Sequence, residues 1–365
     1  MNRLSRLVAA VSLLLAAASP AAPADAERIQ KTWDLVMEKW SLETRAATTP
    51  EARAKAMAGR PDATPYAKQM WEVIGAALDQ EWTLEPAAWF LRATPGLLTT
   101  NADGSTSPTF AKEIELIRKT VETRHLKSGH MIPMCMALAA SQDPRSLAIL
   151  EKIQASHPDR KTQGVAALAA AMILKSLGDD ADLMRKRLTC IRKAIVESSD
   201  VEIGGTSVAK LAEDELYIIR FLTKGRVAPD LTGIDSGGRP MKLSESSGKV
   251  VMLLFWSSTS MPEAQGVIRM MAETDRRFKG RPFAIVGVNH DPLEKLRALE
   301  ADGTVPWKNF SDTTKQLAGE YRVGTWPLVY VLDGERKIHY AGNPGSFAEA
   351  TVDGLLAEKK PAAAE

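Results

Sequence analysis

The spacing of apolar residues changes near Arg226, and this change divides the chain into two parts that must fold differently. Before it, apolar residues such as Trp33, Val36 and Trp40 recur at the spacing of an amphipathic helix. After it, continuous apolar runs alternate with helical stretches. The runs cover 250–256, 283–288, 328–332 and 337–340, and the helical stretches cover 263–278, 293–301, 313–321 and 347–357. Buried strands that alternate with helices predict a sheet covered on its faces, which is an α/β domain.

The first part, residues 27–225, predicts an all-helical domain of stacked helical hairpins. Its helices are separated by short breaks that contain helix-starting residues: Asp143-Pro144, His157-Pro158-Asp159, Gly178-Asp179-Asp180 and Gly204-Gly205-Thr206. Short connections place successive helices antiparallel. The stretch 94–110 is the one long polar loop, and a mobile loop is favoured over a functional one.

The two ends of the chain carry signals of a different kind. Arg3 and Arg6 precede a short apolar stretch over 7–18, and Ala24-Asp25-Ala26 has the small-residue pattern of a cleavage site. We therefore expect residues 1–26 to be a signal peptide cut after Ala26, with the product exported to the periplasm or cell envelope and no membrane anchor retained. The α/β domain is expected over 226–358 and a disordered tail over 359–365.

Charge and histidine spacing indicate no nucleic acid, metal or cofactor. Lys and Arg number 47 against 45 Asp and Glu, and no long basic run is present. The five histidines show no ligand spacing. We expect His290, beside Asp291, to be a solvated loop residue, and His125 and His130 to lie on the surface. The run 185–187 is expected to be the wet face of a helix.

Several ordered motifs in the second part resemble one known family. They are Val227-Ala228-Pro229-Asp230, Gly248 to Trp256, Gly287-Val288-Asn289-His290-Asp291, Pro306-Trp307 and Val323-Gly324-Thr325-Trp326-Pro327, followed by Leu332-Asp333-Gly334. Together they resemble the redoxin branch of the thioredoxin-like superfamily, that is, TlpA/ResA-like and AhpC/TSA-related proteins. The resemblance implies a thioredoxin-like fold and a cis peptide bond between Trp326 and Pro327. It also implies an edge at Thr325, Trp326 and Pro327 that can pair with an extended peptide.

The sequence departs from this family at the catalytic motif. Active members carry Cys-x-x-Cys after the Phe-Trp strand, and this chain has Ser260-Met261-Pro262-Glu263. Thiol–disulfide exchange needs an attacking thiolate and a resolving thiol, and a helix start lowers a thiol pKa from about 8.5 to about 7 or below. A serine in that position forms no disulfide and needs an adjacent base to attack. No catalytic residue is therefore assigned.

A second departure is Leu254, which stands where many active members bury a carboxylate. Ser260 and Glu263 also fit a capping box, in which each side chain bonds the other residue's backbone N–H. A well-capped helix is thus the simplest interpretation of the altered motif.

Three functions follow, and the first is favoured. It is a redox-inactive binding or scaffold protein of the cell envelope, whose partner is an envelope protein or an extended peptide segment. The second is a thiol–disulfide oxidoreductase that uses the chain's two cysteines, Cys135 and Cys190, which are either bridged or buried as thiols. The third is a non-redox enzyme that reuses Ser260. The oligomeric state is not predicted.

Overall fold

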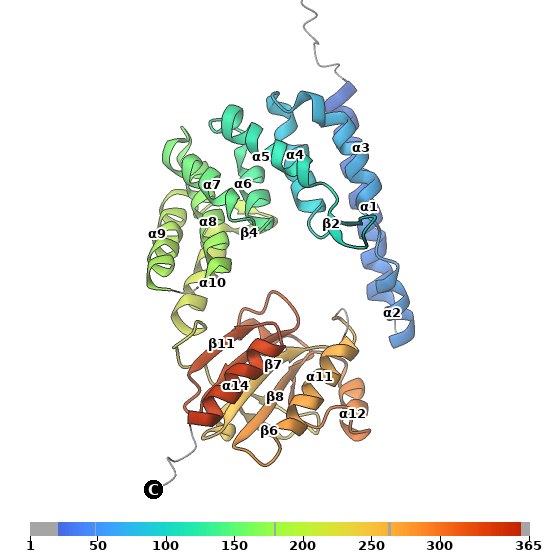
Figure 1. The fold of residues 1–365 in the computed structure, drawn as a ribbon, viewed down its shortest axis with the longest axis vertical. Coiled ribbons are helices and arrows are strands. Elements are labelled where there is room, and N and C mark those ends of the chain that lie inside the picture. Colours follow the sequence, from blue (N-terminus) through green and yellow to red (C-terminus); the bar gives the residue numbers. More distant parts are fainter. Residues whose placement is uncertain (1–20, 48, 179, 262–263, 359–365) are drawn as a thin grey trace, which may run out of the picture. The chain divides into compact units, whose positions relative to one another are not determined.

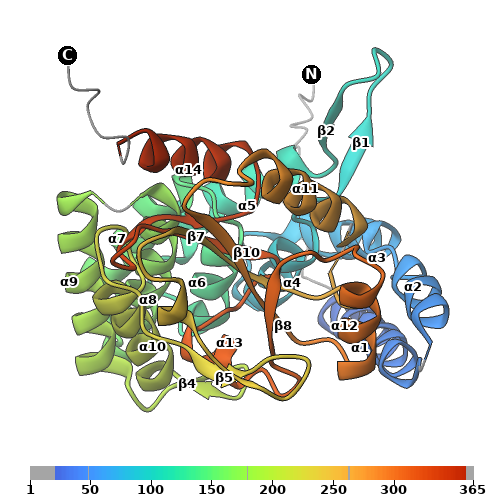
Figure 2. The same ribbon diagram turned by 90° about the horizontal axis from the view of Figure 1, so that it is seen from below.

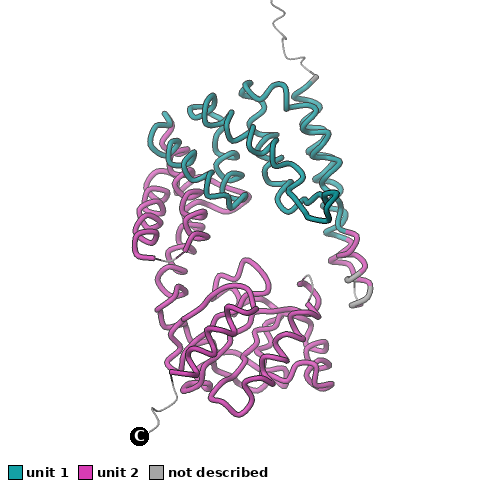
Figure 3. Tube along the Cα trace, in the orientation of Figure 1, with its two compact units in different colours: residues 1–42, 60–158 teal, residues 43–59, 159–365 magenta. Residues whose placement is uncertain are grey.

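The computed structural model describes residues 21–47, 49–178, 180–261 and 264–358 (Figure 1). The chain divides into two compact units, Met1–Leu42 with Arg60–Pro158, and Glu43–Gly59 with Asp159–Glu365 (Figure 3). The predicted signal peptide lies outside the described residues up to position 20, and so does the predicted tail over 359–365. The helices between Asp159 and residue 225 belong to the second unit together with the α/β domain. The boundary between the units therefore precedes the point near residue 225 where the fold changes from helical to α/β.

The first unit is helical, as predicted. Its described helices are α1 (Ala21–Ala46), α3 (Thr64–Ile74), α4 (Leu84–Ala93), α5 (Ala111–Thr120), α6 (Met131–Ala140) and α7 (Arg145–Ser156). The last residues of α1, from Glu43, and all of α2 (Pro50–Ala58) are assigned to the second unit. Aromatic rings join them: the Trp33 ring centroid lies 5.2 Å from that of Tyr66 and 6.5 Å from that of Trp89. Such packing contributes apolar burial and edge-to-face attraction to the core.

Two short hairpins interrupt the helices, so the region is not purely helical. Strands β1 (Leu98–Thr100) and β2 (Thr106–Pro108) pair antiparallel within the stretch predicted as a mobile loop. Figure 2 shows this hairpin as a narrow ribbon. Strands β3 (Glu202–Ile203) and β4 (Thr206–Ser207) pair around Gly204 and Gly205, which both have positive φ. Glycine tolerates that conformation, and the two residues close a tight turn.

Two predictions about polar residues in the helices were wrong. His125 is buried, because its Nε2 lies 2.7 Å from the carbonyl oxygen of Leu78, whereas His130 is exposed as expected. Arg187 is also buried, although its neighbours Arg185 and Lys186 are exposed. Its guanidinium lies 3.2 Å from the Glu215 carboxylate, and this ion pair allows the charge to leave the surface.

The second unit begins with α8 (Arg160–Leu177), α9 (Ala181–Ser198) and α10 (Val208–Phe221). Asp159, Asp180 and Ser207 cap them, because each side chain accepts a backbone N–H of the first turn. The predicted breaks therefore start helices as expected.

A five-stranded sheet follows, in the order β11-β10-β7-β8-β9. Its strands are β7 (Val250–Trp256), β8 (Phe283–Asn289), β9 (Lys308–Ser311), β10 (Leu328–Leu332) and β11 (Ile338–Gly342). Strands β7, β8 and β9 are parallel, while β10 runs antiparallel to both β7 and β11. The small hairpin of β5 (Thr232–Ile234) and β6 (Pro240–Lys242) precedes the sheet. This α/β architecture is the predicted one.

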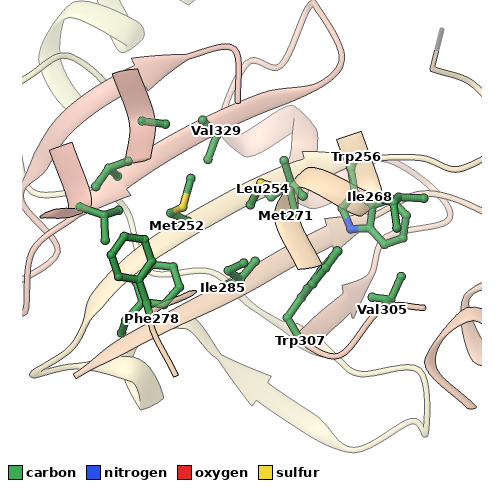
Figure 4. Packing of buried hydrophobic residues seen from close by; sticks show 14 of the residues in the cluster. Met252, Leu254, Trp256, Ile268, Met271, Phe278, Ile285, Val305, Trp307 and Val329 are labelled. Atoms are coloured by element: carbon green, nitrogen blue, oxygen red, sulfur yellow. The ribbon is translucent and has the colours of Figure 1, made fainter. Parts of the chain in front are cut away.

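Alternate residues of β7 enter two different cores. Met252, Leu254 and Trp256 face a cluster with side chains of α11 (Ala264–Arg277), α12 (Leu293–Ala301) and α14 (Ser346–Glu358) (Figure 4). Val251, Leu253 and Phe255 face a second cluster with α13 (Gln316–Glu320). Burial on both faces explains why β7 is apolar at every position.

Helix α10 packs against the second cluster. Its Tyr217 and Phe221 lie on the cluster, and Leu222, just after the helix, is buried within it. The Arg322 guanidinium lies 4.2 Å from the Tyr217 ring centroid, and its Nε lies 2.7 Å from Asp214. Helix α10 thus contributes to the core of the α/β domain.

Within the described ranges, no helix has both the length and the apolar character needed to cross a bilayer.

Candidate functional site

The altered motif follows β7 directly. Ser257 to Met261 leave the carboxyl end of that strand, and α11 begins at Ala264. Pro262 and Glu263 lie outside the described residues, and with them half of the predicted capping box. Leu254 is buried in the sheet core, as expected for a position without a carboxylate.

A buried carboxylate nevertheless lies beneath the motif, supplied by the next strand. Asp291 follows β8 and is 1% exposed. Its Oδ1 accepts the Ser257 hydroxyl at 2.5 Å and the Thr259 hydroxyl at 2.6 Å, and its Oδ2 accepts the Ser258 N–H at 2.7 Å. Asn289 Nδ2 donates to the same Oδ2 at 3.0 Å. These donors fold the motif segment around the carboxylate.

The Asp291 charge is stabilised in place. Burial by itself would raise the pKa of this carboxyl, but the hydrogen bonds from Ser257, Thr259, Asn289 and the Ser258 N–H lower the pKa below its usual value. A fixed negative charge beneath the motif disfavours any further anion there, including a thiolate or a serine alkoxide.

Ser260 is exposed at the end of this loop. Its N–H donates to the Ser257 hydroxyl at 3.0 Å. Across the described part of the chain, no histidine or carboxylate is hydrogen-bonded to the Ser260 hydroxyl. The base that a serine nucleophile needs is therefore absent from those residues.

His290 is not the solvated residue that we expected. Its ring lies 4.3 Å from the Trp326 ring, and both ring nitrogens are buried without a hydrogen-bond partner among the described residues. Burial lowers the pKa of His290, and nearby Lys315 lowers it further. The imidazole is therefore neutral at pH 7. The prediction was wrong because Trp326, far away in sequence, covers the strand end.

The predicted peptide edge lies beside the motif. The Trp326–Pro327 bond is cis, as predicted, and the Trp326 ring centroid lies 6.4 Å from that of Phe255 in β7. Thr325 is exposed. In the described part of the chain, neither Thr325 nor Trp326 makes a backbone–backbone hydrogen bond. Unpaired backbone groups of this kind are what an added strand uses.

The two cysteines form no disulfide, which corrects the bridge considered for Cys135 and Cys190. Both are buried thiols, Cys135 in α6 and Cys190 in α9. Cys135 packs with its apolar helix neighbours Met134 and Leu138, which are all 0% exposed, so its sulfur points into a core. Burial raises the pKa of the Cys135 thiol to about 12, so almost no reactive thiolate exists near pH 7.

The structure thus places the edge that precedes β10 beside the end of β7, from which the motif leaves, while both cysteines belong to helices before the α/β domain. Sequence reasoning missed Asp291 and Lys315. Asp291 had a signal, because an acid at a strand end can meet a run of hydroxyl residues at the end of the neighbouring strand. Lys315 had none, since it comes near Trp326 only through folding.

Comparisons with known proteins show which family the α/β domain resembles. Residues 224–341 match the model of the AhpC/TSA family. Peroxiredoxin Q from the chloroplast of Sedum lineare is 28% identical over 142 residues, which cover 37% of this chain and 76% of that protein. Protein DipZ of Mycobacterium tuberculosis is 28% identical over 149 residues, which cover 37% of this chain and 21% of that protein.

A solved structure gives a similar match. The thioredoxin domain of a thiol-disulfide oxidoreductase from Bacteroides vulgatus is 28% identical, with a TM-score of 0.33, and the match covers 37% of this chain and 99% of that domain. The family model thus corresponds to the α/β part. From the family model, the strand order and the cis-proline strand, we conclude that the C-terminal part of this chain is a thioredoxin-like domain of the redoxin, AhpC/TSA-related type.

Proposed function

We propose that this protein is a redox-inactive binding module of the cell envelope. In this proposal the thioredoxin-like domain holds an extended peptide segment of a partner protein at Thr325 and Trp326. The N-terminal signal pattern supports export.

One observation carries the proposal: the loop in the catalytic position is folded around buried Asp291 by hydroxyl groups. Thiol exchange needs two sulfur atoms, and residues 226–358 contain no cysteine. The peptide edge is independent of that chemistry, because strand addition uses backbone groups. Among the residues that the structure describes, Thr325 and Trp326 have no backbone–backbone partner for those groups.

The two alternatives have less support. An oxidoreductase that uses Cys135 and Cys190 would need exposed thiols with lowered pKa, whereas Cys135 is fully buried with a raised pKa. An enzyme that reuses Ser260 would need a base, and the buried negative charge of Asp291 opposes ionisation of nearby hydroxyls.

A display experiment tests peptide capture. A randomised library of extended peptides is selected on the immobilised full-length protein, and the recovered peptides are synthesised. The proposal predicts dissociation constants in the micromolar range and a loss of at least tenfold in Trp326→Ala. The matched control is Trp82→Ala, which changes a partly buried tryptophan of the other unit. Recovery of no binding peptide, or equal binding to both variants, would contradict peptide capture at this edge.

A further inference from the structure

A cation and two aromatic rings lie next to the proposed peptide edge. The Lys315 ammonium lies 5.8 Å from the Trp326 ring centroid, and the His290 ring packs on the same indole at 4.3 Å. Lys315 is exposed, and the other two are partly buried. We call these three residues the basic–aromatic cluster.

Unlike several arginines of the α/β domain, the cation of this cluster has no carboxylate partner among the described residues. Arg239, Arg322 and Arg336 each pair with an aspartate of the same unit, at 2.8, 2.7 and 3.1 Å. No such pair forms for Lys315 among the described residues. Its ammonium lies over an aromatic face instead, where it stays available to an anion from outside.

The backbone places this lysine in a conformation that lysine rarely adopts. Lys315 has a φ of 61°, in the left-handed region, just before α13. Its N–H donates to the Asp312 carbonyl at 2.9 Å. The Asp312 carboxylate accepts the backbone N–H groups of Leu317 and Ala318 in α13. Left-handed non-glycine residues concentrate at functional sites. Here the conformation supports a role for the side chain.

Within the described ranges, the charged groups that act on His290 besides Lys315 are Asp291 and Asp312, and both are buried and already bonded. Asp291 holds the motif loop, and Asp312 accepts the N–H groups of α13. Each is no more than 3% exposed. His290 is neutral at pH 7, as argued above. Among these described groups, Lys315 is therefore the exposed charge that a ligand at Trp326 would meet.

We propose that the basic–aromatic cluster selects an acidic side chain in the bound peptide. This inference rests on the proposed function, and it names the class of segment that is captured. The peptide backbone pairs with Thr325 and Trp326, and an Asp or Glu of the peptide forms an ion pair with Lys315. The aliphatic part of that side chain packs on the Trp326 indole.

The test uses the peptide with the highest affinity from a library selected on the full-length protein. It is synthesised with Glu and with Gln at its enriched acidic position, and both are titrated by fluorescence polarisation at 50 mM and 500 mM salt. We expect Glu to bind about fivefold tighter than Gln at low salt, the size of a surface ion pair. That preference should shrink at high salt, because screening weakens exposed pairs.

Two variants assign the effect to the cluster. Lys315→Gln should remove the preference for Glu, so that this variant binds the Glu and the Gln peptide with equal affinity. The matched control is Lys279→Gln, which changes an exposed lysine just after the C-terminal end of α11. This variant should keep the preference for Glu. Thermal melts of both variants report whether folding is preserved, and Lys315→Arg should retain the preference.

The outcomes separate the two proposals. Acidic selection would be overturned if the selected peptides had no enriched Asp or Glu, or if Lys315→Gln still preferred the Glu peptide over the Gln peptide. Peptide capture would stand in both cases. A library that yields no binding peptide would overturn peptide capture itself, and acidic selection with it.

Discussion

Asp291 determines the shape of the altered motif at the scale of single residues. In an active redoxin motif, a thiolate is stabilised at the start of a helix. Here the negative charge lies beneath the loop, and the hydroxyls of Ser257 and Thr259 point toward it. The segment is therefore a hydrogen-bonded structure in its own right, with a chemistry different from that of a dithiol.

Replacing Asp291 with Asn should destabilise the domain by about 2–4 kcal/mol. The carboxylate oxygens now accept hydrogen bonds on both sides, and the Asn NH2 group would put its hydrogens against some of those donors. Urea unfolding at pH 7 measures this loss. Asp302→Asn, an exposed residue that only caps its own turn, should leave the free energy of unfolding unchanged.

The same variant should show a defined pH dependence. The folded-state pKa of Asp291 is lowered, so its contribution is present above the unfolded pKa of about 3.9 and is lost as pH falls through the folded value. The stability difference between wild type and Asp291→Asn should therefore shrink below about pH 4. A difference that stays constant between pH 7 and pH 3 would contradict this role.

At the scale of elements, the sheet depends on one close approach between strands. Gly287 in β8 leaves room for the Asn309 Oδ1 of β9, which accepts the indole N–H of Trp256 at 3.0 Å and that of Trp307 at 3.1 Å. A Cβ at Gly287 would lie 1.9 Å from that oxygen. No side chain fits there without displacing the Asn309 amide.

Gly287→Ala should therefore cost about 2–3 kcal/mol of unfolding free energy, through overpacking and lost hydrogen bonds. Gly354→Ala is the matched control. Position 354 lies exposed within α14 with nothing within 4 Å of an added Cβ, so alanine should stabilise that helix by about 1 kcal/mol. Thermal or urea unfolding measures both, and equal effects would contradict this explanation of Gly287.

Elements with a strong local pattern could be predicted from the sequence. Strand β7 has the predicted ends, because it is apolar throughout, and α9 starts at the predicted break, because Asp180 caps it. Strand β9 was missed, since Lys308 to Ser311 has no apolar run and becomes a strand by pairing with β8. The hairpin β1–β2 was missed for the same reason.

The candidate site was predictable only in part. The motif positions and the cis-proline edge were predicted from the resemblance to the redoxin branch, which rests on short stretches of sequence. The burial of His290 beneath Trp326 and the approach of Lys315 depend on how strand ends and α13 meet, and no local pattern encodes this.

At the scale of the whole molecule, the helical and α/β parts share a core at α10. Leu222, just after this helix, belongs to the second cluster of the sheet, and Tyr217 and Phe221 pack against that cluster. The secondary structure therefore changes near residue 225, but side chains on both sides of that point pack in the same core.

A fragment over 226–358 should be less stable than one over 208–358 by about 2–4 kcal/mol, from the apolar area that α10 covers. Chemical unfolding of both fragments measures the difference. Tyr217→Ala with Phe221→Ala in the longer fragment should lower its stability toward that of the shorter one. Equal stability of the two fragments would contradict a shared core.

The absence of thiol chemistry is the central claim, and a turnover assay tests it most directly. Reduction of insulin by dithiothreitol is followed with the purified wild-type chain and with Cys135→Ser/Cys190→Ser. We predict that both proteins leave the uncatalysed rate unchanged, because the two cysteines are buried in the wild-type chain and absent from the double variant. Acceleration by the wild-type protein would contradict the account, and its loss in the double variant would place the chemistry at the helical cysteines.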